Sequence, residues 1–141
     1  MKKWIFPLIA GLLVLVSCKT VEVVKYEYRS TTMLGSRTVT ITQDSIVTAY
    51  SGRAEATREA RATTPEEWTA LKEGMSNVDL KAIASLESPT NKRSTDASPY
   101  GMVKISTADS TYQSASFDGY DSHEMLAPLM VEIKKIAQKR R

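Results

Sequence analysis

The stretch VTITQDSIVTAYSG, residues 39–52, decides the fold of this chain. β-Branched residues lie on both sides of Gln43 and Asp44, which is typical of two antiparallel strands joined by a tight turn. Residues 103–119, VKISTADSTYQSASFDG, repeat the order V-x-I-[ST], Asp-Ser and a closing glycine, and predict a second hairpin that turns around residues 108–110. The two hairpins are either a duplication or two similar amphipathic units, and the sequence leaves both interpretations open.

Strand patterns also occur on either side of the first hairpin. Residues 21–30, VEVVKYEYRS, alternate apolar and charged side chains, which predicts an N-terminal strand. Residues 53–63 are predicted as a further strand, because Ala54, Ala56, Ala60 and Ala62 fall on one side of an extended chain.

Helix signals follow each hairpin unit. Thr64 and Glu67 have the spacing of a capping box, so we expect a helix from Pro65 to a terminating Gly74. Residues 78–86 have apolar side chains at helical spacing and predict a shorter helix, and the polar residues 87–99 predict a loop. The last helix should begin near Pro128, since a proline is poorly tolerated inside a helix.

These elements predict an α+β fold, in which an antiparallel sheet built from two hairpins plus an N-terminal strand carries helices on one face. Ten apolar residues are expected inside: Val39, Ile41, Trp68, Leu71, Ile83, Val103, Ile105, Phe117, Leu129 and Ile133.

The N-terminus has the three-part pattern of an export signal. Lys2 and Lys3 precede an apolar run from residue 4 to 16, which is too short for a membrane-spanning helix. The run ends in Leu15-Val16-Ser17-Cys18, which resembles the lipobox of bacterial lipoproteins. This resemblance implies that residues 1–17 are removed, that Cys18 is lipidated and that residues 18–20 form a short tether. From their length, residues 21–141 are expected to form a single domain with its own core.

Charge and cysteine content limit the function classes. Loss of Lys2 and Lys3 leaves 17 basic against 16 acidic residues, a net charge of +1 that gives no support for nucleic-acid binding. Cys18 is the single cysteine, so a disulfide within the chain is excluded. Lys19 replaces the aspartate that retains enteric-type lipoproteins in the inner membrane, so the resemblance favours the outer membrane and its periplasmic side.

Reactive residue types are densest in FDGYDSHE, residues 117–124. His123 is the single histidine, and a hydrolase centred on it is the least favoured hypothesis, because catalytic triads are assembled from distant segments. With no second histidine and no free cysteine, no metal or other cofactor is expected. The alternative is structural: Asp121 caps the last helix, Glu124 closes a capping box, and Asp118-Gly119 forms a turn.

Two other features could bind a ligand. Lys92 and Arg93 in the loop TNKRST, residues 90–95, could hold an anion, although adjacent charges in a loop are often merely solvated. The tyrosines at positions 26, 28, 100, 112 and 120 could line a ligand face or could cover the sheet. Lys92, Arg93, Tyr120 and His123 are therefore the candidate ligand or partner contacts.

Three segments within residues 64–134 carry a second pattern: EEWTAL, DLKAIASLESPTNKRSTDAS and YQSASFDGYDSHEMLAPLMVEI. This pattern resembles that of small Bacteroidetes-type envelope lipoproteins, although Gly119-Tyr120 departs from it after Phe-Asp. It implies localisation and fold, and no activity. The leading expectation is a lipid-anchored, non-catalytic envelope protein that binds a protein or another envelope component, and the alternative is a binder of a small ligand or an anion.

Overall fold

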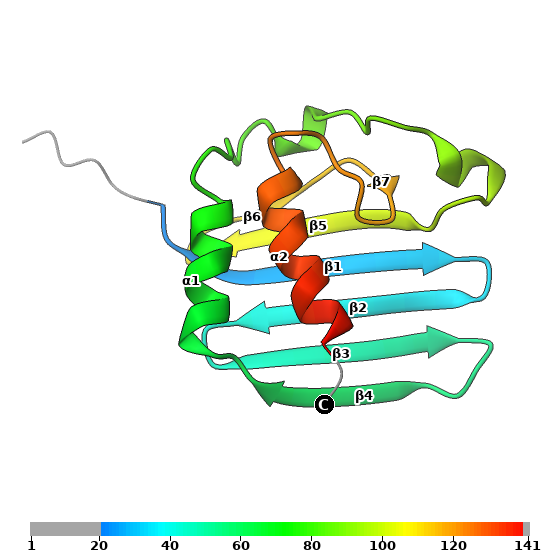
Figure 1. Cartoon of the computed structure of the whole chain (residues 1–141), viewed down its shortest axis with the longest axis horizontal. Coiled ribbons are helices and arrows are strands. Elements are labelled where there is room, and N and C mark those ends of the chain that lie inside the picture. The colour runs from blue at the N-terminus through cyan, green and yellow to red at the C-terminus, as the bar shows by residue number, and fades with distance from the viewer. Residues whose placement is uncertain (1–20, 140–141) are drawn as a thin grey trace, which may run out of the picture.

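The computed structural model describes residues 21–139, in which helices and strands form two layers (Figure 1). Cys18 and the expected signal peptide lie outside the described residues. The elements are, in chain order, β1 (Val23–Thr32), β2 (Gly35–Thr42), β3 (Ser45–Gly52), β4 (Thr57–Ala62), α1 (Pro65–Gly74), the 3₁₀ helices η1 (Ile83–Ser85) and η2 (Lys92–Thr95), β5 (Tyr100–Thr107), β6 (Thr111–Gln113), β7 (Phe117–Asp118) and α2 (Ala127–Gln138).

The strands form one antiparallel sheet of seven strands in the order β4-β3-β2-β1-β5-β6, with β7 also paired to β5. The N-terminal strand β1 therefore lies between the two hairpins and pairs with both. Tyr28 lies opposite Val39 on one side and Val103 on the other, and Tyr26 lies between the isoleucines two positions further along each hairpin. The predicted α+β architecture is confirmed, and the duplication stays a prediction.

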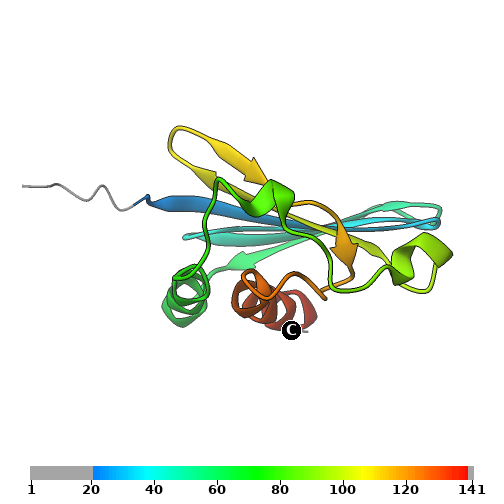
Figure 2. The same cartoon turned by 90° about the horizontal axis from the view of Figure 1, so that it is seen from above.

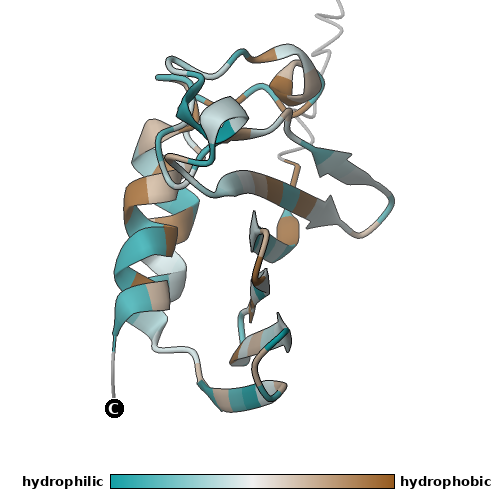
Figure 3. Ribbon diagram, turned by 90° about the vertical axis from the view of Figure 1, so that its right-hand side faces the viewer, coloured by the Kyte–Doolittle hydropathy of each residue, from teal (hydrophilic) through white to brown (hydrophobic). Residues whose placement is uncertain are grey.

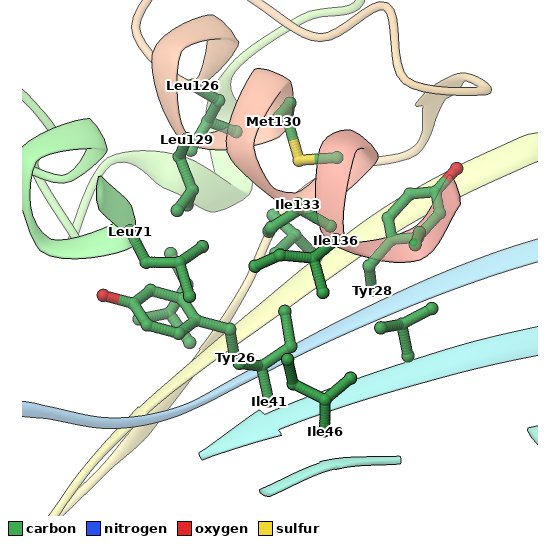
Figure 4. Close-up of a cluster of buried hydrophobic side chains, with 14 of the residues drawn as sticks. Tyr26, Tyr28, Ile41, Ile46, Leu71, Leu126, Leu129, Met130, Ile133 and Ile136 are labelled. Carbon is green, nitrogen blue, oxygen red and sulfur yellow. The ribbon is translucent and has the colours of Figure 1, made fainter. Parts of the chain in front are cut away.

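Both helices cover the same face of the sheet (Figures 2 and 3), as predicted. The core between the layers is built from alternate residues of β1, β2 and β5 and from the inner side of α2 (Figure 4). Nine of the ten predicted core residues are buried; the exception, Trp68, is half-buried and packs edge-on against Tyr26 at a ring-centroid distance of 5.5 Å. Trp68 therefore lies at the margin of the core and not at its centre.

Helix α1 starts as predicted. The Glu67 N–H donates to the Thr64 hydroxyl at 3.2 Å, and the Thr64 N–H donates to the Glu67 carboxylate at 3.1 Å, which completes the capping box. The helix does end at Gly74, as predicted, and the absence of a side chain there has a packing reason: a Cβ would lie 2.9 Å from the Leu129 Cα. The glycine thus permits α1 and α2 to approach closely.

Two predictions about the helices were wrong: the helix expected at residues 78–86, and the capping of the last helix by Asp121 and Glu124. Residues 78–86 form turns and the short η1 in place of a helix, because the Asp79 carboxylate accepts from the Lys81 N–H at 3.0 Å and starts a turn. Helix α2 begins at Ala127, with Pro128 in its first turn, as expected for proline. Asp121 and Glu124 lie too far before this start to cap it, and Leu126 at the N-cap position makes no side-chain hydrogen bond.

Candidate functional site

The predicted loop of residues 87–99 is attached to the sheet by a buried carboxylate. Asp118 Oδ2 accepts from the Thr90 hydroxyl at 2.5 Å and from the Lys92 N–H at 2.7 Å, and Oδ1 accepts from the Arg93 N–H and from Arg93 Nη1, both at 3.0 Å. Burial alone would raise the pKa of Asp118, but these hydrogen bonds hold it well below its usual range. Asp118 is therefore the anchor of this loop as well as a turn residue.

This arrangement changes the interpretation of Lys92 and Arg93. The Arg93 guanidinium also donates to the Thr90 carbonyl at 2.9 Å and to the Ser116 hydroxyl at 3.3 Å, and it is largely buried. Lys92 is exposed, so its ammonium, unlike the Arg93 guanidinium, remains open to an external anion. Arg93 has a structural role that the sequence did not reveal, because two of its partners, Ser116 and Asp118, lie more than twenty residues away.

Tyr120 is half-buried and stacks on Tyr28 with a ring-centroid distance of 4.5 Å. The Tyr28 hydroxyl donates to the Gly119 carbonyl at 2.7 Å, and the Lys134 ammonium lies 5.8 Å from the centre of the Tyr120 ring. Burial raises the pKa of Tyr120. Since Tyr26 and Tyr28 are buried under the helices, the five tyrosines do not form one exposed face.

His123 lies in the segment before α2. Its Nδ1 accepts from the Met125 N–H at 3.1 Å, and the Ser122 hydroxyl donates to the His123 carbonyl at 3.3 Å and not to the imidazole. Asp121 is exposed. The three residue types thus lie together without the hydrogen-bond chain of a catalytic triad. Within residues 21–139, no cluster of His, Cys, Asp or Glu has the arrangement of a metal site.

A cleft of about 760 Å³ lies on the helix-covered face, between the C-terminal end of α2 and strands β3 and β4. Its floor includes Ile46 and Ile136, and its walls are mostly polar. The cleft exists because β4 places Glu59 and Arg61 on this face, opposite Thr48 and Ile46, where an apolar helix surface does not pack.

Four cationic residues line this cleft. They are Arg37, Arg58, Arg61 and Lys139. The two carboxylates nearby are Glu59, in the wall, and Glu67, which pairs with Arg61 at 2.8 Å and with Lys139 at 3.2 Å. The formal balance of the cleft is therefore positive by two charges.

Two of the guanidinium groups remain available to a ligand. Arg37 is exposed and donates from Nη2 to the Ala137 carbonyl at 2.7 Å, which satisfies one of the free carbonyls at the end of α2 and leaves its other N–H groups open. Arg58 is exposed and makes no ion pair with any residue in the described part of the chain. Arginine pairs well with planar carboxylates and with phosphates, so the cleft suits an anionic group.

No local pattern in the sequence indicated this cleft. Its cations come from β2, β4 and the end of α2, and isolated arginines at such positions are indistinguishable from ordinary surface charges before the topology is known. At the end of α2, a lysine or arginine is also favoured by the helix dipole, so its presence there does not by itself indicate a binding site.

Comparisons of the chain with protein-family models, with curated proteins and with solved structures found no match. Neither helix within residues 21–139 is long and apolar enough to cross a membrane.

Proposed function

We propose that the protein is a lipid-anchored, non-catalytic component of the cell envelope, and that the cationic cleft binds a carboxylate or phosphate group of an envelope component. The observation that carries the binding proposal is the excess of positive charge around an open cleft, with Arg58 unpaired among the described residues and Arg37 only partly engaged. The favoured location is the periplasmic side of the outer membrane.

The proposed anchor fits the position of the domain in the sequence. Strand β1 starts at Val23, so residues 19–22 would separate it from a lipidated Cys18. Four extended residues span at most about 14 Å. Two or three acyl chains on Cys18 would give stable attachment, whereas one chain binds a membrane only marginally.

The anchor is tested by labelling cells with a radioactive fatty acid. The intact chain should incorporate the label and be processed, while Cys18→Ser should remain an unlabelled precursor. A Ser17→Ala variant, which keeps a small residue before the cysteine, serves as the matched control and should still be labelled. Label on the Cys18→Ser protein would contradict the proposal.

The cleft is tested on the domain of residues 21–141, produced without the N-terminal segment, by two-dimensional amide NMR during titration with inorganic phosphate at low ionic strength. Shifts should concentrate in β4 and at the end of α2, and the double variant Arg37→Ala and Arg58→Ala should weaken binding about tenfold or more. Arg29→Ala is the control, because Arg29 is exposed and its neighbour in β1, Tyr28, points to the opposite face. If Arg29→Ala weakens binding as much as the single variant Arg58→Ala, which removes the same charge, the effect reduces to net charge and the site is refuted.

A further inference from the structure

A second hollow lies between the β1–β2 turn and the segment that leads into β5. These two segments lie at one end of the sheet (Figure 1). Its volume is about 440 Å³. Met33 and Leu34 form one side, Pro99 and Tyr100 form the other, and Asp96 lies beside them. This is the opposite end of β1 from Val23, since Thr31 pairs with Tyr100 and Val23 pairs with Thr107.

Large apolar side chains are unusually exposed here. Met33 is 74% exposed, Leu34 is 59% exposed and Tyr100 is 47% exposed. Scattered apolar residues on a surface need no explanation, but a group of them around one hollow marks an interaction surface.

The β1–β2 turn holds these side chains outward. The Leu34 carbonyl accepts from the Arg53 N–H at 2.9 Å and from the Tyr50 hydroxyl at 3.1 Å, and the Leu34 N–H donates to the Thr32 hydroxyl at 3.2 Å. A Cβ at Gly52 would lie only 2.3 Å from the Leu34 carbonyl oxygen, so the neighbouring hairpin tip fits tightly against this turn. These bonds fix the backbone of Leu34, and its side chain is 59% exposed beside the hollow.

The opposite wall is fixed as well. The Pro99 carbonyl accepts from the Gly119 N–H at 2.8 Å, and the preceding η2 is attached to Asp118. Asp96 ends η2 in the left-handed conformation, with φ of 55°, and its carboxylate makes no hydrogen bond or ion pair with any residue described in the structure. The hollow therefore combines a rigid apolar lining with one unpaired negative charge.

This combination selects the chemistry of an occupant. An aliphatic side chain would bury apolar area against Met33, Leu34 and Tyr100, at about 25 cal/mol per Å². A lysine or arginine beside it would pair with Asp96. An anionic membrane surface fits less well, because the carboxylate would be repelled by the headgroups and because a concave surface does not insert.

We propose that this hollow docks a segment of a partner protein that presents an aliphatic side chain next to a lysine or arginine. The hollow is separate from the cationic cleft and does not depend on it. With the proposed anchor near Val23, the hollow lies at the other end of a strand of ten residues, about 33 Å away at about 3.3 Å per residue. A partner could then reach it without contacting the membrane.

The test uses the same domain of residues 21–141 and amide NMR, with a synthetic peptide in which leucine and arginine are adjacent, flanked by glycine and serine. Two matched peptides replace the leucine by serine or the arginine by glutamate. The leucine–arginine peptide should shift the signals of residues 31–34 and 96–100 with millimolar affinity, and each matched peptide should bind at least fivefold more weakly.

Variants of the domain locate the interaction. Leu34→Ser and Asp96→Asn should each weaken peptide binding about five- to tenfold. Val24→Ser is the control, because Val24 is 45% exposed near the other end of β1, and it should bind as the unmodified domain does. The cleft variant Arg58→Ala should also bind normally, which separates this proposal from the proposed function.

Three results would overturn the proposal. The first is an absence of shifts at these residues with the leucine–arginine peptide. The second is co-sedimentation of the domain with phosphatidylglycerol vesicles that is lost in Leu34→Ser while peptide binding is not detected, since this would identify a membrane contact. The third is self-association that disappears in Leu34→Ser and is not displaced by the peptide, since this would identify a second copy as the occupant.

Discussion

Tyr26 and Tyr28 allow a test of the core in which two chemically identical substitutions have opposite effects. Both tyrosines are on β1, both are buried, and both lie between corresponding residues of the two hairpins. The Tyr28 hydroxyl donates to the Gly119 carbonyl at 2.7 Å, whereas the Tyr26 hydroxyl is buried without a hydrogen-bond partner among the described residues. Replacing each by phenylalanine removes one oxygen and little else.

The expected magnitudes follow from this difference. A buried hydroxyl without a partner costs about 1–3 kcal/mol, so Tyr26→Phe should raise the free energy of unfolding by about 1–2 kcal/mol. Tyr28→Phe removes a hydrogen bond and leaves the Gly119 carbonyl without that partner, so it should lower the free energy of unfolding by about 1–2 kcal/mol. The two variants should therefore differ by about 2–4 kcal/mol.

Urea unfolding followed by far-ultraviolet circular dichroism measures both variants. Fluorescence is a poor choice, because Trp68 packs edge-on against Tyr26 and its emission would respond to the substitution itself. A destabilised Tyr26→Phe would refute the reasoning and would mean that the hydroxyl is hydrogen-bonded in solution, for example to a buried water.

The burial of Tyr26 also predicts that the stability of the domain falls at alkaline pH. Burial raises the pKa of Tyr26 from 10.0 to about 12, so the unfolded chain ionises at this residue before the folded chain does. Its contribution to stability is therefore present below pH 10 and is lost as the pH rises towards 12. Phenylalanine has no hydroxyl to ionise, so Tyr26→Phe does not suffer this loss, and its stability advantage over the unmodified domain should widen across that range.

Three further predictions concern the loop anchor, the helix contact and the capping box. Asp118→Asn places amide hydrogens opposite N–H donors, so hydrogen exchange of residues 90–93 should accelerate and the melting temperature should fall; unchanged exchange would contradict the anchor. Gly74→Ala would normally favour a helix by about 1 kcal/mol, but here the new Cβ would lie 2.9 Å from the Leu129 Cα, so a net loss of stability is expected in urea unfolding, and a gain would contradict the close approach. The Arg61 guanidinium lowers the pKa of Glu67 from 4.5 to about 2, so this residue stabilises the fold above pH 4.5 and the contribution is lost as the pH falls towards 2; Glu67→Gln should flatten acid unfolding over that range, and an unaltered profile would argue against the pairing.

Local patterns predicted the elements of this fold well. The hairpins, the capping box of α1 and the position of Pro128 each depend on residues a few positions apart, whose interactions are set by backbone geometry. The helix expected at residues 78–86 failed because apolar spacing alone does not detect a competing turn from a side chain such as Asp79.

Contacts between residues far apart in the chain could not be predicted from local patterns. The pairing of Tyr28 with Val103 joins residues far apart in the chain, and no local pattern places β1 between the hairpins. Asp118 was predicted as part of a turn because Asp-Gly is a turn signal, but the donors that surround its carboxylate lie on another loop. The cationic cleft likewise exists only once β4 and the end of α2 are brought together.

The central position of β1 has a mechanical consequence. A force applied through the N-terminus runs along this strand, which is bonded to β2 and to β5 over most of its length. The hydrogen bonds of antiparallel ladders run perpendicular to the strands, so such a force loads both ladders in shear, and many bonds must break together. A strand at the edge of the sheet would have one ladder instead of two. If the chain is held to a membrane at its N-terminus, traction from a bound partner would therefore meet the most resistant part of the sheet first.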